Sequence, residues 1–163
     1  MKLTYVEIGQ IVNTHGVRGE LKLRPLDVEA ELLRRCKTFY IDGAPVSPTA
    51  RRIHKGCLLF QLPGVDSVDA ALPYKGKTVS VRRSELPLPE GAYLPAELMG
   101  MAVEDAESGA ALGKIAGVIP YPAHDVYVVR GEKEFMVPAV EAFVASVDLE
   151  ANVMKIHVWE GLI

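Results

Sequence analysis

The stretch I-V-N-T-H-G-V-R-G-E-L-K-L-R, residues 11–24, joins two extended segments through a short loop that contains two glycines. In its second half apolar and polar residues alternate, and this period of two predicts a half-buried strand whose leucines face inward. Gly16 and Gly19 lie three positions apart at the join, where a bend with positive φ favours glycine. The stretch therefore predicts a β-hairpin with His15 beside its loop.

The loop of this hairpin permits two interpretations. As a turn, it needs only its glycines and a polar Asn or Thr side chain that bonds its own backbone. As a binding surface, it would leave backbone N–H groups and Arg18 free to meet phosphate, with Lys22 and Arg24 continuing along the outward face of the next strand. We expect His15 to be a turn and surface residue of an RNA- or protein-binding loop, and not a general base. Further basic residues would extend the surface if they lay on one face: Arg34, Arg35, Lys37, Arg51, Arg52 and Lys55.

The rest of the first half shows short apolar runs separated by turn signals. Asp-Gly at residues 42–43 and His-Lys-Gly at residues 54–56 each separate two such runs and predict β-hairpins. A short helix is expected over Asp66–Leu72, capped by its aspartate or by the serine that follows, and closed by proline and glycine. A second helical turn is expected over Glu29–Arg35.

Length and composition favour two small domains of the mainly β class. A chain of 163 residues has room for two domains of roughly 80 residues, each near the lower size limit for burying its own core. The segment S-E-L-P-L-P-E-G has two prolines and a glycine in eight residues, as expected of a semi-rigid connector. We therefore place an N-terminal domain over residues 1–83, a proline-rich linker over 84–91 and a C-terminal domain over 92–163.

The C-terminal half again shows short strands with turn signals, and it predicts a second small barrel or curled sheet. Only the segment V-E-A-F-V-A-S-V, residues 140–147, has a helix-like pattern, and it precedes a last strand.

Charge divides unequally between the halves. Residues 1–83 carry 14 Lys+Arg and 8 Asp+Glu, net +6, whereas residues 84–163 carry 4 and 13, net −9. A basic half suits phosphate backbones and an acidic half suits a basic protein, so one molecule could contact both components of a nucleoprotein particle. The alternative is that charge varies between the domains only for solubility.

No pattern in the chain points to catalysis, a metal or a cofactor. The chain lacks H-E-x-x-H, G-x-S-x-G and G-x-G-x-x-G, and residues 109–115 are one residue too short between glycines for a phosphate loop. The four histidines are scattered singly, and the acidic cluster at residues 104–107 fits a solvated loop. We expect the protein not to be an enzyme. The alternatives are a small enzyme or flavin-binding barrel, and an adaptor that binds only protein.

Cysteine spacing and hydropathy indicate the cellular compartment of the protein. Cys36 and Cys57 stand 21 positions apart, in neither a zinc-ligand nor a C-x-x-C spacing, which favours a reduced interior over a disulfide scaffold. The first ten residues have no apolar core of signal-peptide length, and no run of 18 apolar residues lacks a charge. We expect a soluble, cytoplasmic protein that is not exported.

Five segments together resemble the bacterial ribosome maturation factor family RimM. They occur in the same order and spacing over nearly the whole chain, which makes the resemblance specific. The segments are I-G-Q-I-V-N-T-H-G-V-R-G-E-L-K-L, L-P-G-V-D-S-V-D-A-A, E-G-A-Y-L-P-A-E-L-M-G, A-H-D-V-Y-V-V-R and E-F-M-V-P-A-V-E-A-F-V-A-S-V-D-L-E.

This resemblance implies a six-stranded N-terminal barrel of the translation-factor type and a C-terminal PRC barrel. It also implies a non-catalytic, monomeric factor that needs no cofactor. Such a factor binds the free small (30S) ribosomal subunit or its precursor and assists folding and processing of the small-subunit rRNA head. Its PRC domain is expected to bind a head protein of that subunit, the nineteenth in the series, and the acidic half suits such a basic partner.

The resemblance also assigns site residues. The family's loop falls on Thr14, His15, Gly16 and Gly19, and with Arg18, Lys22 and Arg24 these form the expected RNA- or ribosome-binding set. For the partner protein we expect Tyr93, Leu94 and Asp125. The family has two adjacent tyrosines where this chain has Tyr93 and Leu94, and leucine loses the hydroxyl and the ring stacking. Tyr93 could instead be a core or interdomain aromatic residue, and Asp125 could cap a turn.

Overall fold

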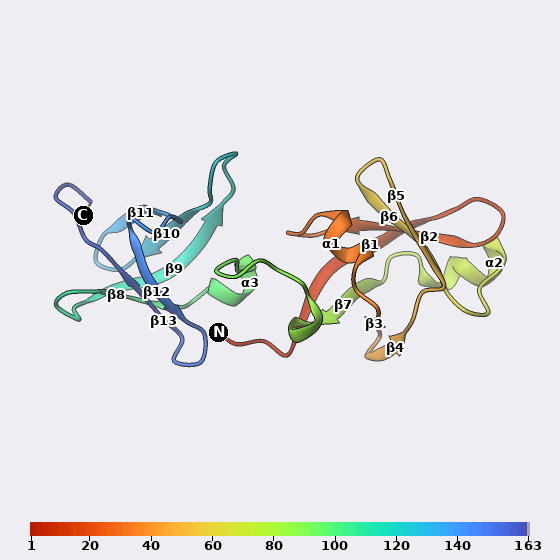
Figure 1. Ribbon diagram of the computed structural model, residues 1–163, viewed down its shortest axis with the longest axis horizontal. Helices are drawn as coiled ribbons and strands as arrows, with labels where there is room; N and C mark the ends of the chain where they lie inside the picture. The colour runs from red at the N-terminus through yellow and green to blue at the C-terminus, as the bar shows by residue number, and fades with distance from the viewer. Residues whose placement is uncertain (163) are drawn as a thin grey trace. The chain divides into compact units, whose positions relative to one another are not determined.

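The computed structural model describes residues 1–162, which divide into two compact units. The N-terminal unit is Leu3–Ala92, and the C-terminal unit comprises Met1–Lys2 and the residues from Tyr93 onward. Each unit is built on one β-sheet with a few short helices, so the mainly β class predicted from the sequence is confirmed (Figure 1).

The N-terminal unit holds a seven-stranded sheet in the order β4-β3-β7-β1-β2-β6-β5, with every neighbouring pair antiparallel. The family resemblance implied six strands, whereas this sheet has seven, of which β3 and β4 have only three residues each. The strands are β1 (Tyr5–His15), β2 (Glu20–Pro25), β3 (Phe39–Ile41), β4 (Ala44–Val46), β5 (Ala50–His54), β6 (Cys57–Gln61) and β7 (Thr78–Arg82).

This sheet curls back on itself around an apolar core. Phe39 of β3 and Phe60 of β6 are separated in the sheet by three strands, yet their rings meet edge to face with centroids 5.3 Å apart. Near the sheet's edge, Arg51 of β5 donates a hydrogen bond of 2.8 Å to the carbonyl of Lys37, just ahead of β3. Both contacts require a barrel-like curl. The inward-facing residues of β2, Leu21 and Leu23 of the predicted alternation, are fully buried.

Short helices and tight turns complete the N-terminal unit. Ser67 caps α2 by accepting a hydrogen bond of 3.2 Å from the backbone N–H of Ala70, which confirms one of the two expected caps. The turns predicted at 42–43 and 54–56 are present, and the two central residues of each have positive φ, as type I′ hairpin turns require. The helices are α1 (Ala30–Arg34), α2 (Val68–Ala71) and the 3₁₀ segments η1 (Leu72–Tyr74) and η2 (Arg83–Glu85).

The C-terminal unit holds a six-stranded sheet in the order β11-β10-β9-β8-β13-β12. Its pairs are antiparallel except β13 with β8, which is parallel. The elements are α3 (Pro95–Leu98), β8 (Ala102–Asp105), β9 (Ala111–Ile119), β10 (Val126–Arg130), β11 (Glu134–Pro138), β12 (Val144–Asp148) and β13 (Val153–Ile156).

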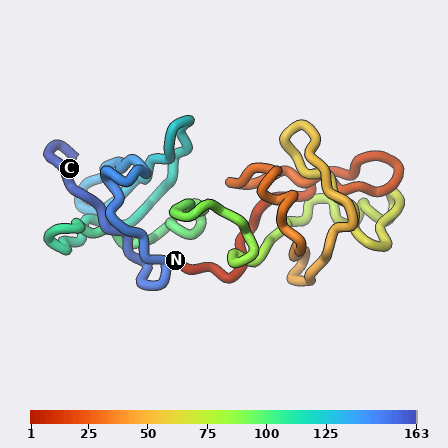
Figure 2. Tube along the Cα trace, in the orientation of Figure 1, coloured from red at the N-terminus to blue at the C-terminus, as the bar shows by residue number. Residues whose placement is uncertain are grey.

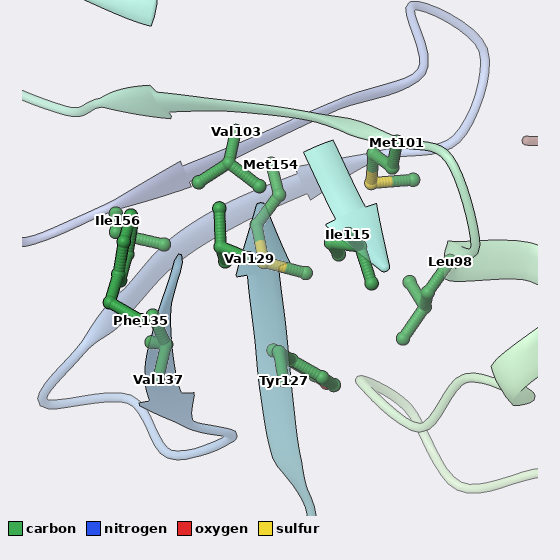
Figure 3. Close-up of a cluster of buried hydrophobic side chains, with 10 residues drawn as sticks. All are labelled: Leu98, Met101, Val103, Ile115, Tyr127, Val129, Phe135, Val137, Met154 and Ile156. Atoms are coloured by element: carbon green, nitrogen blue, oxygen red, sulfur yellow. The ribbon is translucent and has the colours of Figure 1, made fainter. Parts of the chain in front are cut away.

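Alternate residues of these strands form the core of the C-terminal unit (Figure 3). On β10, for example, Tyr127 and Val129 are buried while the residues between and beside them are more exposed. Leu98 of α3 joins the same cluster. Because this core anchors β10 and α3, it also fixes the chain on either side of them, where Tyr93 and Asp125 lie.

The helix expected over residues 140–147 is wrong. After a turn at 141–143, the chain forms strand β12, in which Val144 pairs with Ile156 of β13. Three β-branched valines favour a pleated strand over a helix. Pairing with β13, the next strand along the chain, decides the outcome, and β13 is itself held by distant β8.

Gly19 is required by close packing as well as by its φ of +80°. A Cβ atom there would lie 2.5 Å from the carbonyl oxygen of Ser67, so the β1–β2 loop rests directly on the cap of α2 (Figure 2). Gly16, in the same loop, has a φ of +72° but nothing within 4 Å of a built Cβ. A side chain at Gly16 would therefore add backbone strain alone, whereas one at Gly19 would add both strain and a clash.

We expect Gly19→Ala to lower the free energy of unfolding by about 2–4 kcal/mol, because strain and a backbone clash add. Gly16→Ala is the matched control and should cost about 1 kcal/mol from strain alone. Urea denaturation of both variants measures the difference. Equal losses would show that the contact between the loop and Ser67 does not stabilise the fold.

Candidate nucleic-acid and partner-binding surfaces

Side-chain hydrogen bonds to its backbone hold the β1–β2 loop in shape, one from within the loop and one from β6. β1 ends at His15 and β2 begins at Glu20, and these two residues pair across the hairpin. The side chain of Asn13 accepts a hydrogen bond of 2.9 Å from the next N–H, as the turn interpretation expected. Gln61 of β6 donates one of 2.7 Å to the carbonyl of Arg18. The loop is thus held in one shape while the Arg18 side chain stays exposed.

A basic surface lies on the outward side of strands β1, β2, β6 and β5. Lys22 and Arg52 both pair with Leu59 in the strand register, so the three residues share one face. The rings of His15 and His54 meet on this side, with centroids 5.2 Å apart. We call this surface the basic face; it consists of His15, Arg18, Lys22, Arg52, His54 and Lys55.

Glu20 is the acidic residue within the basic face, and Arg52 engages it with two hydrogen bonds. The Nη2 and Nε atoms of Arg52 lie 3.0 and 3.2 Å from the two carboxylate oxygens. These hydrogen bonds hold the pKa of Glu20 below its ordinary value; burial opposes them, and the charges of Arg52, His15 and Arg18 add to them. A bidentate pair of this kind fixes the orientation of the guanidinium as well as binding it.

His54 lies among positive charges. Burial is the largest cause that lowers its pKa, and the charges of His15, Lys55, Arg52 and Lys22 lower it further, in that order. A lowered pKa keeps this imidazole neutral at pH 7. His54 therefore adds less positive charge to the face than the arginines and lysines around it do.

Of the other predicted RNA-binding residues, some are exposed and could contact RNA, and some only shape the loop. Thr14 is half-buried and Gly19 is buried against α2, so both shape the loop, whereas Gly16 is exposed. Arg24 is exposed, lies 3.5 Å from the amide oxygen of Gln10, and lines a shallow groove together with Lys55. Arg24 therefore continues the basic face.

Of the basic residues expected to extend this surface, Arg52 and Lys55 join it. Arg34 does not, because it lies on α1, where Glu31 binds it with two hydrogen bonds of 3.0 and 2.6 Å. Arg51 pairs with buried Phe60 and points to the opposite side of the sheet.

In the C-terminal unit, the sequence-predicted residues Tyr93 and Asp125 lie around Tyr127. Burial raises the pKa of the Tyr127 phenol, and the charges of Asp125 and Tyr93 raise it further. Tyr93 packs against the core but stays half-exposed. Leu94 is only 4% exposed, and its N–H donates a hydrogen bond of 2.8 Å to the carboxylate of Glu97. Leu94 can therefore support a contact only by positioning its neighbours.

Two residues of these surfaces were missed by sequence reasoning. His54 seemed isolated because its neighbour His15 is 39 positions away, and only the curl of the sheet brings them together. Tyr127 lies in an alternating strand and carries no signal beyond an aromatic residue at an inward position.

Cys36 and Cys57 are both free thiols, and burial raises the pKa of Cys36.

Within residues 1–162, no group of three or more His, Cys, Asp or Glu side chains is arranged to hold a metal ion. The same residues form no helix that is both long and apolar enough to cross a membrane.

We expect NMR titration of the imidazole protons to give His54 a pKa below its ordinary value. His15→Ala should raise that pKa only in part, because the nearby positive charge is removed while burial, the larger cause, remains. Since unfolded His54 takes up its proton more readily, stability relative to His54→Gln should fall as pH drops through about 6.5. No change in the His54 pKa on removing His15 would contradict the ring contact.

Comparison with known proteins covers both units. Residues 6–86 match the family model of the RimM N-terminal domain, and residues 95–162 match that of the RimM PRC barrel domain. The chain is 40% identical over 163 residues to "Ribosome maturation factor RimM" of Syntrophotalea carbinolica, covering 96% of this chain and 93% of that protein.

Two further relatives carry the same name. The protein of Clostridium botulinum is 31% identical over 160 residues, covering 96% of this chain and 97% of the relative. That of Clostridioides difficile is 35% identical over 168 residues, covering 99% and 98%. With both of its units matched and relatives similar over nearly their full length, this chain belongs to the RimM family.

Proposed function

We propose that this chain is a ribosome maturation factor that binds the free small ribosomal subunit or its precursor. It assists folding and processing of the head region of the small-subunit rRNA, and it does so by binding rather than by catalysis. The observation that carries this proposal is the basic face, which adjoins the signature loop of a family whose relatives are named ribosome maturation factors.

The basic face suits a phosphate backbone. Arg18, Lys22 and Lys55 are cations on one side of a rigid sheet, and Arg52 is held there by Glu20. Contacts of this kind position a protein on RNA without reading its sequence. A general base is not supported at His15, because the Glu20 carboxylate is taken up by Arg52 and is not free to orient an imidazole.

The C-terminal unit suits a basic protein partner, which we propose is the nineteenth protein of the small subunit. Residues 84–163 carry 4 Lys+Arg against 13 Asp+Glu, so a basic surface is attracted to them. Tyr93 offers a half-exposed ring near Tyr127, on which the charge of Asp125 also acts, and tyrosine is among the residues enriched at the centres of protein interfaces.

Co-sedimentation with separated small subunits, large subunits and whole ribosomes tests the proposal. We expect selective binding to free small subunits that weakens steeply between about 50 and 200 mM salt, because phosphate contacts release counterions. Lys22→Ala should weaken binding and reduce the salt slope by about one.

Lys133→Ala is the matched control, since Lys133 is an exposed lysine of the acidic half. It should leave both the affinity and the slope unchanged. Binding that does not respond to salt would remove the phosphate contacts from the proposal.

We also expect Tyr93→Ala to weaken binding to the purified head protein about 10-fold, the usual loss at a central interface tyrosine. Tyr121→Ala is the control, because Tyr121 is 52% exposed in the same unit and is assigned no contact. Isothermal titration calorimetry measures both, after unfolding curves confirm that each variant is folded. Equal affinities for the two variants would leave Tyr93 as a core residue.

A further inference from the structure

A second surface of the N-terminal unit gathers aromatic and cationic side chains away from the basic face. It lies on the outward side of β3, β7 and β1, whose inward residues, among them Val6 and Val81, are buried. Tyr5 pairs with Arg82 in the register, and Tyr40 pairs with Ser80, so these side chains share the outward face. Tyr5 is 47% exposed, so much of its ring is open to solvent.

The two rings and the arginine form a fixed arrangement. Tyr5 and Tyr40 meet edge to face with centroids 5.1 Å apart. Arg82 donates a hydrogen bond of 2.9 Å from Nε to the Tyr40 hydroxyl, and its guanidinium carbon lies 5.6 and 5.9 Å from the Tyr5 and Tyr40 ring centroids. The two terminal nitrogens of Arg82 make no hydrogen bond or ion pair within residues 1–162. The Glu85 carboxylate acts on Arg82 only through its charge, so the two terminal nitrogens can still donate to an anion.

A groove runs beside these rings. Its volume is about 670 Å³, within the range of small-molecule sites. The parts of its lining that matter here are Tyr5, Glu7, Tyr40, Lys77, Thr78 and Ser80. Lys77 pairs with Asp42 at one end, so Glu7 is the carboxylate in the groove that makes no ion pair within residues 1–162.

We propose that this groove binds an unpaired base of single-stranded RNA. The base stacks on the exposed ring of Tyr5, while the terminal nitrogens of Arg82 bind the adjoining phosphate. Glu7 accepts a hydrogen bond from an amino group on the base edge, as carboxylates do with cytosine. Stacking on aromatic side chains is the usual way in which proteins hold unpaired bases.

The charges favour a base over a basic peptide. A lysine or arginine side chain from a protein would be repelled by the positive charge of Arg82 beside both rings, whereas an uncharged base would not. Glu7 at the groove equally disfavours a phosphate lying inside it, which places the phosphate at Arg82 and the uncharged base in the groove. The ligand that fits is therefore neutral and flat, with an anionic neighbour.

This inference rests on the proposed function in so far as the ligand is RNA, but it concerns a different surface. The basic face contacts phosphates and should bind duplex and single strand alike. The tyrosine groove needs an unstacked base and should respond to single strands only. The two contacts can therefore be tested separately in one assay.

The test measures binding of the full-length protein to a fluorescein-labelled RNA octamer and to a duplex of the same sequence. Tyr5→Ala should weaken octamer binding about 10-fold and leave duplex binding unchanged. Tyr5→Phe, which keeps the ring, should bind both RNAs like the wild type. Lys22→Ala should weaken binding to both.

Each other outcome is informative. If the octamer binds but Tyr5→Ala has no effect, the groove proposal fails and the proposed function stands. If neither RNA binds, the RNA contact of the proposed function fails as well. If an arginine-rich peptide binds in a Tyr5-dependent way and the octamer does not displace it, the groove is a protein site and the inference is overturned.

NMR of the wild type gives a check that does not depend on a variant folding. Adding cytidine monophosphate should shift the ring protons of Tyr5 and Tyr40 upfield, because a stacked base shields them. Unchanged ring signals at saturating nucleotide would overturn the proposal.

Discussion

The strand pairing and curl of the N-terminal sheet are the constraint on which both surfaces of that unit depend. Seven antiparallel strands bend until β3 and β6 meet through Phe39 and Phe60. A flat sheet of the same order would keep His15 of β1 and His54 of β5 apart, with two strands between them, yet their rings are in contact. Because the curl is driven by burying apolar side chains on the inner face, the hydrophobic core determines which polar residues become neighbours outside it.

On the outward side of the N-terminal unit, nearby carboxylates decide which arginines can still attract an anion. Arg52 is bound by Glu20 and Arg34 by Glu31, but the consequences differ. Glu20 lies among several cations, so it orients Arg52 without cancelling the positive field, whereas Arg34 forms an isolated, exposed pair. The acidic half carries the opposite charge, so the two halves of the chain attract ligands of opposite sign.

Aromatic residues have three different roles in this small protein. Phe39 and Phe60 fill the interior of the curled sheet. Tyr127 anchors β10 in the core of the C-terminal unit, while Tyr93 lies over that core and remains half-exposed. Tyr5 is held at the surface by its partners instead of being buried. Exposure combined with fixed geometry distinguishes a ring that can receive a ligand from one that only packs.

The sequence by itself determined the mainly β class, the hairpins at 42–43 and 54–56, and the capped helix near Ser67, because alternation and turn chemistry are local. It also indicated the loop of residues 14–19 and the family. Only the tertiary structure decided that residues 140–147 enter a turn and strand and that Gly19 packs on Ser67. The same holds for the neighbours gathered on the basic face and beside Tyr5. These outcomes depend on strand pairing and curl between distant segments, and no local pattern records which segments will meet.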